Sequence, residues 1–406
     1  MARIPLQMVG AGPAGISMVL ALCNRLLSGP DSQPVQQILD TLELFESSAR
    51  AGGEMGRYRI NANTSSTDVV LGIADGSPFQ TVRDRYLQYP ETQSKLIALP
   101  RIETLMVQPL VDRLQDFLGE RLRYNTAVQR VRVDANGFQS FDVNDQLLAE
   151  SENMLLCCGG REVLLEELGD YADRCEFSTD FLKRDNIDSL LQQPGAVVIV
   201  GASHSAFSCV WRLLHDPLFA DFIAGRGIVM LVRRNNIKLR CSEEFAREHR
   251  VEYDAERDVC PQSGIVFHNG GLRKDAKDLY LRIRDGDESR VKLVQIKQLS
   301  DQADLLGQAA LVLQSTGFRT NLPRIERDGA PLTIGQPTSI GELTSAPDNI
   351  IIPGLFGMGL GLNTVPQSVR GEASFTGSIN GFQSYPLSIA PHIIDRILVN
   401  MKSGLI

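Results

Sequence analysis

The sequence predicts an α/β protein made of two three-layer domains, the second inserted within the first. Two observations predict this fold. A glycine-rich turn, Gly10–Gly15, directly follows the apolar run Pro5–Val9. About half a chain later, a second small-residue turn, Gly201–Ala206, follows the apolar run Ala196–Val200. Each turn has the pattern of a buried strand running into an apolar helix, so each predicts a Rossmann-like unit.

The first turn has three glycines whose spacing predicts a dinucleotide-binding site. Gly10 allows the tight turn out of the strand, Gly12 lets the backbone approach a pyrophosphate, and Gly15 lets the helix pack on the sheet. Pro13 and Ala14 begin that helix, whose N-terminal amides face the phosphates. The alternative is a glycine-rich turn with a purely structural role.

The second turn is degenerate, because Ser203 and Ala206 replace its later two glycines. Alone it would be equally typical of an ordinary strand–helix junction. Beside the stronger first motif it predicts a second dinucleotide site, with Gly201, Ser203, His204 and Ser205 as candidate residues. Two dinucleotides held close together indicate electron transfer between them.

The composition is that of a soluble globular protein with two or three domains. The 406 residues are 43% hydrophobic and carry a formal net charge of −8, which argues against a nucleic-acid partner. No apolar stretch reaches the ~20 residues that a membrane helix needs. The N-terminus carries no signal-like segment, so no membrane partner is expected.

The seven cysteines form no C-x-x-C pair, and the five histidines show no clustered ligand spacing. The sequence therefore predicts neither a metal site nor a thiol–disulfide redox site. Cys157 and Cys158 are expected to be small buried hydrophobic residues. An odd number of cysteines without paired spacing indicates a reducing cytoplasm.

In the first part of the chain, a helix is expected over residues 14–28 and a second strand over residues 42–46. That strand ends in Glu46, which is placed to accept hydrogen bonds from a ribose diol. The alternative is an exposed carboxylate at a strand end. The gap between the turn and Glu46 is longer than usual, and we assign the polar stretch 29–36 to a loop insertion.

A long polar, glycine-rich passage follows over residues 51–67, and such passages in compact domains are usually functional loops. Its amide and hydroxyl side chains are suited to positioning a polar substrate, and Asn61, Asn63 and Thr64 are the catalytic candidates. The alternative is a surface loop rich in turn-forming residues.

Further elements of the first domain are a helix over residues 103–119 and a strand over 121–133, with a hairpin partner at 138–143. The strand 154–158 then ends at Gly159, which predicts a second close approach of the backbone.

The second domain begins in earnest at Ala196, after a polar crossing segment over residues 166–194. Its second strand, residues 228–232, ends in Arg233 and Arg234. The other expected elements are a helix opening at 207–214, strands at 309–313 and 349–353, a helix from about 364 and a closing helix at 388–402. The predicted domain ranges are 1–165 and 316–406 for the first domain, and 166–315 for the inserted domain.

With both turns, Glu46 and the strand exits at Cys158–Gly160 and Ser315–Phe318 in view, the chain resembles the two-dinucleotide-binding-domain flavoproteins. Within that superfamily it is similar to the class B flavin monooxygenases, which include N-hydroxylating and flavin-containing monooxygenases. The resemblance covers the whole chain in order, through short motifs. It implies FAD in the first domain and a nicotinamide nucleotide in the inserted domain.

The resemblance also implies which residues contact the cofactors. Those for FAD are Gly10, Gly12, Pro13, Ala14 and Gly15 at the pyrophosphate, Glu46 at the ribose, Gly53 and Glu54 near the flavin, Val128 at the adenine, Gly159 and Gly317 at the strand exits, and Gly359, Leu360, Gly361 and Asn363 at the flavin pyrimidine edge. The family often carries an Asp in that late motif. Since none is present here, the late contact must come mostly from the backbone.

Arg233 and Arg234 follow a strand at the place where NAD-specific folds carry an acid. A guanidinium there pairs with a 2′-phosphate, so the two arginines predict NADPH as the second cofactor. The alternative is a solvated basic strand end.

The implied activity is that of an FAD- and NADPH-dependent monooxygenase acting on a small molecule with molecular oxygen. NADPH reduces the flavin, oxygen adds at its C4a carbon to form a peroxyflavin, and the terminal oxygen passes to a nucleophilic substrate. Residues 175–181 lack the F-x-G-x-x-x-H pattern of Baeyer–Villiger and flavin-containing monooxygenases, which weakens the resemblance to those subfamilies. An N-hydroxylase-like or otherwise divergent monooxygenase stays open.

Two alternatives stay open at this point. One is a flavin dehydrogenase or reductase without oxygen insertion, and the other is a non-catalytic flavoprotein. The sequence also leaves open a homo-oligomer and the identity of the substrate.

Overall fold

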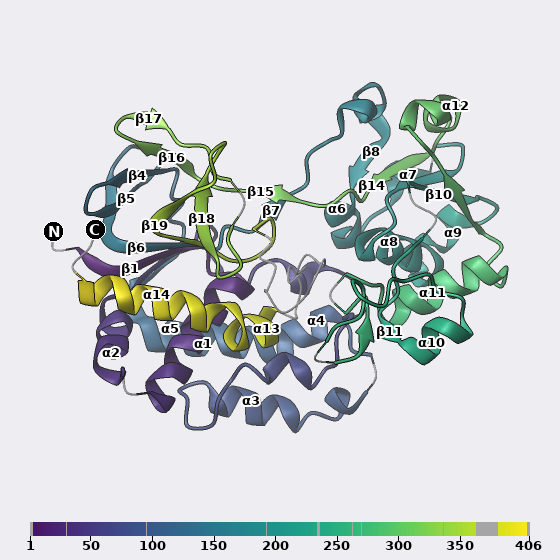
Figure 1. Cartoon of the computed structure of the whole chain (residues 1–406). Coiled ribbons are helices and arrows are strands. Elements are labelled where there is room, and N and C mark those ends of the chain that lie inside the picture. The colour runs from purple at the N-terminus through teal and green to yellow at the C-terminus, as the bar shows by residue number, and fades with distance from the viewer. Residues whose placement is uncertain are drawn as a thin grey trace.

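The computed structural model describes residues 3–403, except residues 30, 95, 192, 234, 235, 262, 269, 336 and 363–380. The described chain forms two α/β lobes, each built on its own sheet (Figure 1). Within these ranges, none of the helices combines the length and the apolar character that a membrane span requires.

The first sheet takes strands from both ends of the chain. Its central strand β1 pairs in parallel with β2 on one side and with β6 on the other, and β3 continues the parallel part beyond β2. On the far side, β4, β5 and β6 pair in antiparallel order. The strands are β1 (Ile4–Val9), β2 (Glu43–Phe45), β3 (Leu122–Arg123), β4 (Arg130–Asp134), β5 (Gly137–Phe141), β6 (Leu147–Leu156), β16 (Arg324–Arg327), β17 (Ala330–Pro331), β18 (Glu342–Ser345) and β19 (Ile350–Gly357).

The first lobe has a core on each face of its sheet. One core packs the sheet against α1, α2, α5, α13 and α14, and the other lies among β4, β5, β16, β18 and β19. The helices are α1 (Pro13–Ser28), α2 (Ser32–Thr41), α3 (Gln80–Leu87), α4 (Leu99–Ile102), α5 (Gln108–Leu118), α13 (Gly381–Leu387) and α14 (Ile389–Ser403).

The second lobe is a parallel five-stranded sheet in the order β13-β10-β9-β14-β8, with an apolar core on each face. Its strands are β8 (Cys175–Phe177), β9 (Val197–Val200), β10 (Ile228–Val232), β13 (Val291–Gln295) and β14 (Leu311–Gln314). Around it lie α6 (Ser178–Lys183), α7 (Asp188–Leu191), α8 (His204–His215), α9 (Ala220–Ile223), α10 (Glu243–Glu248), α11 (Lys274–Asp285), α12 (Ala303–Gly307) and a small two-stranded antiparallel sheet of β11 (Cys241–Ser242) and β12 (Ile265–Val266).

The two connections between the lobes run side by side. The outgoing strand β7 (Gly160–Arg161) pairs in antiparallel fashion with the returning strand β15 (Arg319–Thr320). Figure 1 shows this two-stranded ribbon between the lobes. A Cβ atom at Gly160 would lie 2.8 Å from the Cβ of Phe318, so the two connections are in close contact.

Three sequence expectations differ from the structure, and the first concerns residues 29–36. We expected a loop insertion there, but residues from Ser32 onward form α2. Val35, Ile38 and Leu39 are buried on one face of that helix. Their i, i+3, i+4 spacing is a helical apolar stripe, which the surrounding polar residues conceal.

The second difference is that the strand expected over residues 121–133 is broken into β3 and β4. Between them Asn125 adopts a left-handed conformation with φ of 51°. Its amide and that of Thr126 donate to the carbonyls of Ser48 and Glu46, at 3.0 and 2.9 Å, instead of continuing a strand ladder. The third difference is that the second sheet starts before Ala196, because β8 pairs with β14.

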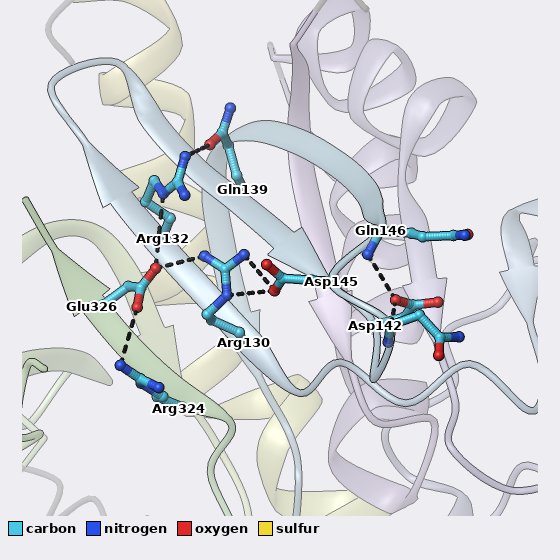
Figure 2. A network of polar contacts seen from close by, with 9 residues as sticks. Arg130, Arg132, Gln139, Asp142, Asp145, Gln146, Arg324 and Glu326 are labelled. Carbon is cyan, nitrogen blue, oxygen red and sulfur yellow. Dashed lines mark hydrogen bonds and ion pairs between the residues drawn. The ribbon is translucent and has the colours of Figure 1, made fainter. Parts of the chain in front are cut away.

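An ion-pair network fastens the returning chain to the first part of the sheet. Glu326 on β16 accepts from Arg130 on β4 at 2.5 Å, and Arg132 and Arg324 lie 3.8 and 3.7 Å from the same carboxylate (Figure 2). Arg130 also pairs with Asp145 at 2.6 Å. The pKa of Arg130 is raised, and its hydrogen bond to Asp145 is the largest cause. The network therefore joins residues nearly 200 positions apart along a parallel strand pair.

We expect Glu326→Gln to destabilise the protein by roughly 1.5–3 kcal/mol, because Glu326 is only 9% exposed and its charged hydrogen bonds are lost. Asp145→Asn removes another partner of Arg130, but Asp145 is 71% exposed, and its loss should cost less than about 1 kcal/mol. Urea unfolding of the two variants measures the difference. Equal and small losses of stability in the two variants would show that the ion pairs of Glu326 contribute no more than a surface ion pair.

Candidate functional site

A large cavity lies at the carboxyl ends of β1, β2, β6 and β19. It has a volume of about 760 Å³. This edge of a parallel sheet is where open α/β folds bind their ligands. Eleven of the residues that the sequence assigned to FAD line it: Gly10, Gly12, Pro13, Ala14, Glu46, Gly53, Glu54, Val128, Gly159, Gly359 and Leu360.

The three glycines of the first turn have three different surroundings. A Cβ at Gly10, where φ is +101°, would lie 2.3 Å from the carbonyl oxygen of Cys157. A Cβ at Gly15 would lie 2.0 Å from the carbonyl oxygen of Gly10. A Cβ at Gly12 would meet no atom within 4 Å. Packing therefore requires Gly10 and Gly15, whereas Gly12 keeps cavity space open.

The helix that follows this turn points its N-terminus at the cavity. Gly12 is the N-cap of α1, Pro13 stands in its first turn, and no acidic residue lies there. A glycine N-cap has no side chain to accept from the first-turn amides, so those donors and the helix dipole are available to an anion.

Glu46 directly follows β2, and its two carboxylate oxygens accept different numbers of hydrogen bonds. Its Oε1 accepts from the amide of Ser48 at 2.9 Å and from the Ser48 hydroxyl at 2.8 Å. Its Oε2 accepts from the amide of Ala11 at 2.9 Å. Because a carboxylate oxygen can accept twice, Oε2 keeps capacity for a further donor in the cavity.

Two loops close over the start of α1. Gly53 has φ of +75°, and a Cβ there would lie 3.2 Å from Cδ of Pro13. Gly359 has φ of +115°, and a Cβ there would lie 3.1 Å from the Cβ of Ala14. Glycine at both positions lets the early and late loops share one wall of the cavity.

The cavity also has residues that the sequence reasoning missed, among them Tyr58, Glu162 and Asp180. Glu162 accepts from the hydroxyl of Ser178 at 2.7 Å and from the amide of Thr179 at 2.9 Å. It therefore ties the outgoing connection to the start of α6. No local motif marks these side chains, because they meet only after the second lobe is in place.

The cysteines beside the cavity are held in the thiol form. Burial raises the pKa of Cys158 to about 12 and that of Cys157 well above its usual value. None of the seven cysteines forms a disulfide. Among the residues that the structure describes, no three His, Cys, Asp or Glu side chains gather as metal ligands would.

The second turn repeats the geometry of the first on the other sheet. Gly201 has φ of +134°, and a Cβ there would lie 2.4 Å from the carbonyl oxygen of Ser315. Ser203 is the N-cap of α8 without a side-chain cap hydrogen bond, and Ser205 lies in the first turn of that helix. None of these three residues lines the 760 Å³ cavity.

Other residues that the sequence assigned to cofactors lie near the strand ends of both lobes. Arg233 follows β10 with its side chain 61% exposed, 3.3 Å from Glu167. Gly317 has φ of +92° and open space at its Cβ position. A Cβ at Gly361 would lie 3.0 Å from Cα of Thr320. Arg234 and Asn363 lie outside the described residues.

The three catalytic candidates lie against the second lobe and do not line the 760 Å³ cavity. Asn61 donates to Asp275 Oδ2 at 2.8 Å. Asn63 and Thr64 line a separate cavity of about 580 Å³. Their role in the reaction therefore stays a prediction.

The segment before these candidates is clamped between the lobes. Tyr58 and Ile60 pack against the cores of both lobes. The amide of Arg59 donates to the carbonyl of Leu182 at 3.0 Å, and Lys183 pairs with Glu54 at 3.0 Å. These contacts fix the part of the large cavity's wall formed by Glu54 and Tyr58 relative to the second lobe.

Comparison with known proteins supports the same fold. No protein-family model matches the chain. A CMP-5′-(3-aminopropyl)phosphonate hydroxylase of Streptomyces rubellomurinus is 26% identical over 447 aligned positions, which cover 97% of each protein. An ornithine hydroxylase from Pseudomonas aeruginosa matches in structure with a TM-score of 0.59 at 13% identity, covering 98% of this chain and all of the other.

Two further solved structures match over nearly their whole length. A cadaverine monooxygenase from Erwinia amylovora, bound to FAD, has a TM-score of 0.60 at 15% identity and covers 98% of this chain and 95% of its own. An L-lysine 6-monooxygenase from Pseudomonas syringae has a TM-score of 0.58 at 16% identity, with 97% and 100% covered. This chain has the fold of the class B flavin monooxygenases.

His204 of the second turn is a neutral imidazole inside this fold. Its Nε2 lies 3.1 Å from the carbonyl oxygen of Gly271. Burial lowers its pKa from 6.5 to about 4, and the nearby charge of Arg273 acts in the same direction. His204 therefore brings hydrogen-bonding capacity to the turn, and no positive charge, at neutral pH.

We expect this imidazole to make the protein acid-sensitive. Because its pKa is lower in the folded state than in the unfolded state, the unfolded chain binds the proton first, and stability falls as pH drops from about 6.5 to about 4. The loss from this group is at most about 3–4 kcal/mol. His204→Gln should flatten the pH dependence of urea unfolding in that window. His215→Gln, at the exposed end of the same helix, is the control, and an equal change in both variants would contradict the assignment.

Proposed function

We propose that this protein is an FAD- and NADPH-dependent monooxygenase that transfers oxygen to the primary amine of a small molecule. The observation that carries the proposal is the 760 Å³ cavity at the first turn. Its volume falls within the roughly 300–1,000 Å³ of small-molecule and cofactor sites. The relative and the three structural neighbours support the chemistry, because every one of their names includes an amine-bearing substrate and a hydroxylase or monooxygenase.

The residues present fit FAD. Gly12 leaves space where a side chain would stand, the α1 N-terminus offers amides to a pyrophosphate, and Glu46 Oε2 has room to accept from a ribose hydroxyl. When bound, the flavin accepts electrons from the nicotinamide and activates molecular oxygen. We assign residues 1–165 and 316–406 to the domain that holds it.

The second turn fits NADPH in the inserted domain, for which we propose residues 166–315. The α8 N-terminus, capped by Ser203 without a side-chain hydrogen bond, has amides to offer a pyrophosphate. Arg233 lies at the exit of β10 with an exposed guanidinium, which supports pairing with a 2′-phosphate. Its contact with the exposed Glu167 is a surface ion pair, which a phosphate can replace at little cost.

The chain's own contribution to the reaction is positioning and exclusion of water. The Gly53 and Gly359 loops cover the start of α1, and the clamp at Tyr58 closes the cavity toward the second lobe. The adjacent thiols are protonated and do not act as nucleophiles. The absence of disulfides among the seven cysteines supports a cytoplasmic enzyme. Its proposed partners are the substrate and molecular oxygen.

The direct test is turnover of FAD-loaded protein with NADPH, oxygen and a panel of primary amines. We expect amine-dependent NADPH oxidation and a product whose mass is increased by one oxygen atom. Rapid NADPH oxidation that yields hydrogen peroxide with every amine, and no oxygenated product, would support a reductase. Failure of NADPH to bleach the flavin would support a non-catalytic flavoprotein. Either result would overturn the proposal.

We expect Gly12→Val to fold but to lose FAD. The Cβ at this position meets no protein atom within 4 Å, and its φ of −75° suits any residue, so folding is unaffected. The added methyl groups stand where the pyrophosphate must approach the backbone. Absorbance at flavin wavelengths and circular dichroism measure the two properties. Gly169→Val, also at an open position, is the control and should keep its flavin; full flavin content in Gly12→Val would refute the assignment.

A further inference from the structure

A strongly basic cavity lies beside the proposed flavin site. Its volume is about 580 Å³. Its cationic or basic lining residues are Arg240, His268, Arg273, Lys274 and Lys277, against the two carboxylates of Asp68 and Asp278. The whole chain carries a net charge of −8, so this local excess of positive charge runs against the overall balance. Such concentration favours an anionic ligand.

The fold of the second lobe brings these basic residues together. Arg273 is the N-cap of α11, a helix of 12 residues that begins at Lys274, and its side chain caps no first-turn amide. The one acidic residue in that turn, Asp275, is engaged by Asn61 at 2.8 Å. The dipole of α11 therefore adds to the positive potential of the side chains.

One of the cations is held by an aromatic ring, and another has a buried donor without a partner in the described part of the chain. Lys277 Nζ lies 4.4 Å from the centre of the Phe245 ring. Arg240 Nε is buried and has no hydrogen-bond partner among the described residues. A buried guanidinium donor without an acceptor is costly, and an oxyanion from a ligand would satisfy it.

The first lobe supplies the remaining described lining residues of the basic cavity, which are mostly uncharged, with Asp68 as the one charged side chain among them. Asn63, Thr64 and Ser65 contribute from the long loop. Helix α13 contributes Gln383, Ser384 and Leu387 to the basic cavity, Ser388 follows directly after it, and Tyr385 of the same helix lines the 760 Å³ cavity. Helix α13 therefore lines both cavities.

We infer that the basic cavity binds a doubly charged phosphoryl or phosphonyl group of the substrate, so that the substrate is a primary amine carrying such a group. The inference rests on the proposed function, because it assigns the substrate of that same site. Guanidinium and ammonium groups together match a tetrahedral dianion, for which several donors are needed.

NADPH is the other possible source of a phosphoryl group. None of the described residues proposed for NADPH lines the basic cavity, although His204 of the second turn shares a small neighbouring pocket with Asn63 and Arg273. The cavity instead combines residues of both lobes, including the loop at Asn63. The observations therefore favour the substrate.

The experiment is calorimetric binding to the FAD-loaded protein without turnover. The probes are 3-aminopropylphosphonate, 4-aminobutanoate and n-butylamine, which carry a phosphonate, a carboxylate and no anion. We expect the phosphonate to bind at least about tenfold tighter than n-butylamine. Arg240→Gln and, separately, Lys277→Gln should remove about tenfold of that affinity and leave n-butylamine unchanged.

Arg257→Gln is the matched control, because Arg257 is an exposed cation of the same lobe that does not line the cavity. Equal binding of the three probes, or loss of NADPH affinity instead of phosphonate affinity in the variants, would overturn the inference. Because two separate variants are tested, misfolding of one does not decide the result. Thermal unfolding shows whether each variant is folded. Because binding is measured without oxygen, a failure of oxygen transfer is a separate result.

Discussion

The contact between the Gly10 backbone and the carbonyl of Cys157 is the constraint on which the architecture depends. It lets the chain leave the central strand β1 directly against the end of β6, with no room for a side chain between them. The turn therefore aims the start of α1 over the sheet edge. The second lobe uses the same device, with Gly201 against Ser315 at the exits of β9 and β14. One steric requirement, met twice, produces two helix N-termini able to receive anions.

The first sheet is completed only after the second lobe has been inserted. β19 joins the end of β6, with Leu355 opposite Met154, and β16 joins β4 through the carboxylate of Glu326. The cavity also depends on segments from both sides of the inserted lobe, because Gly53 precedes that lobe in the chain, Gly359 follows it, and both line the cavity. Function is thereby tied to assembly of the whole fold, and no fragment of the chain contains a complete site.

Much of the fold could be predicted because local rules determine it. The glycine turns, the strand ahead of each and the acidic end of β2 at Glu46 follow from steric and pairing rules within a few residues. Helix α2 was missed because its stripe of Val35, Ile38 and Leu39 is short and lies among polar residues. The position of Asn61 against Asp275, and the basic cavity around Arg240, depend on how two lobes meet. Such contacts join distant segments, and a single sequence carries no signal for them.

The pairing of β7 with β15 has a mechanical consequence. Two separate connections would let the inserted lobe slide, tilt and twist on independent tethers. Here the outgoing and returning strands are hydrogen-bonded as one ribbon, with Gly160 packed on Phe318. The ribbon resists stretching, since neither strand can lengthen without breaking its partner's ladder, and it bends most easily across its thin dimension. Sliding of the inserted lobe along the ribbon would therefore break these hydrogen bonds, so the paired strands hold the lobe at a fixed distance from the first sheet.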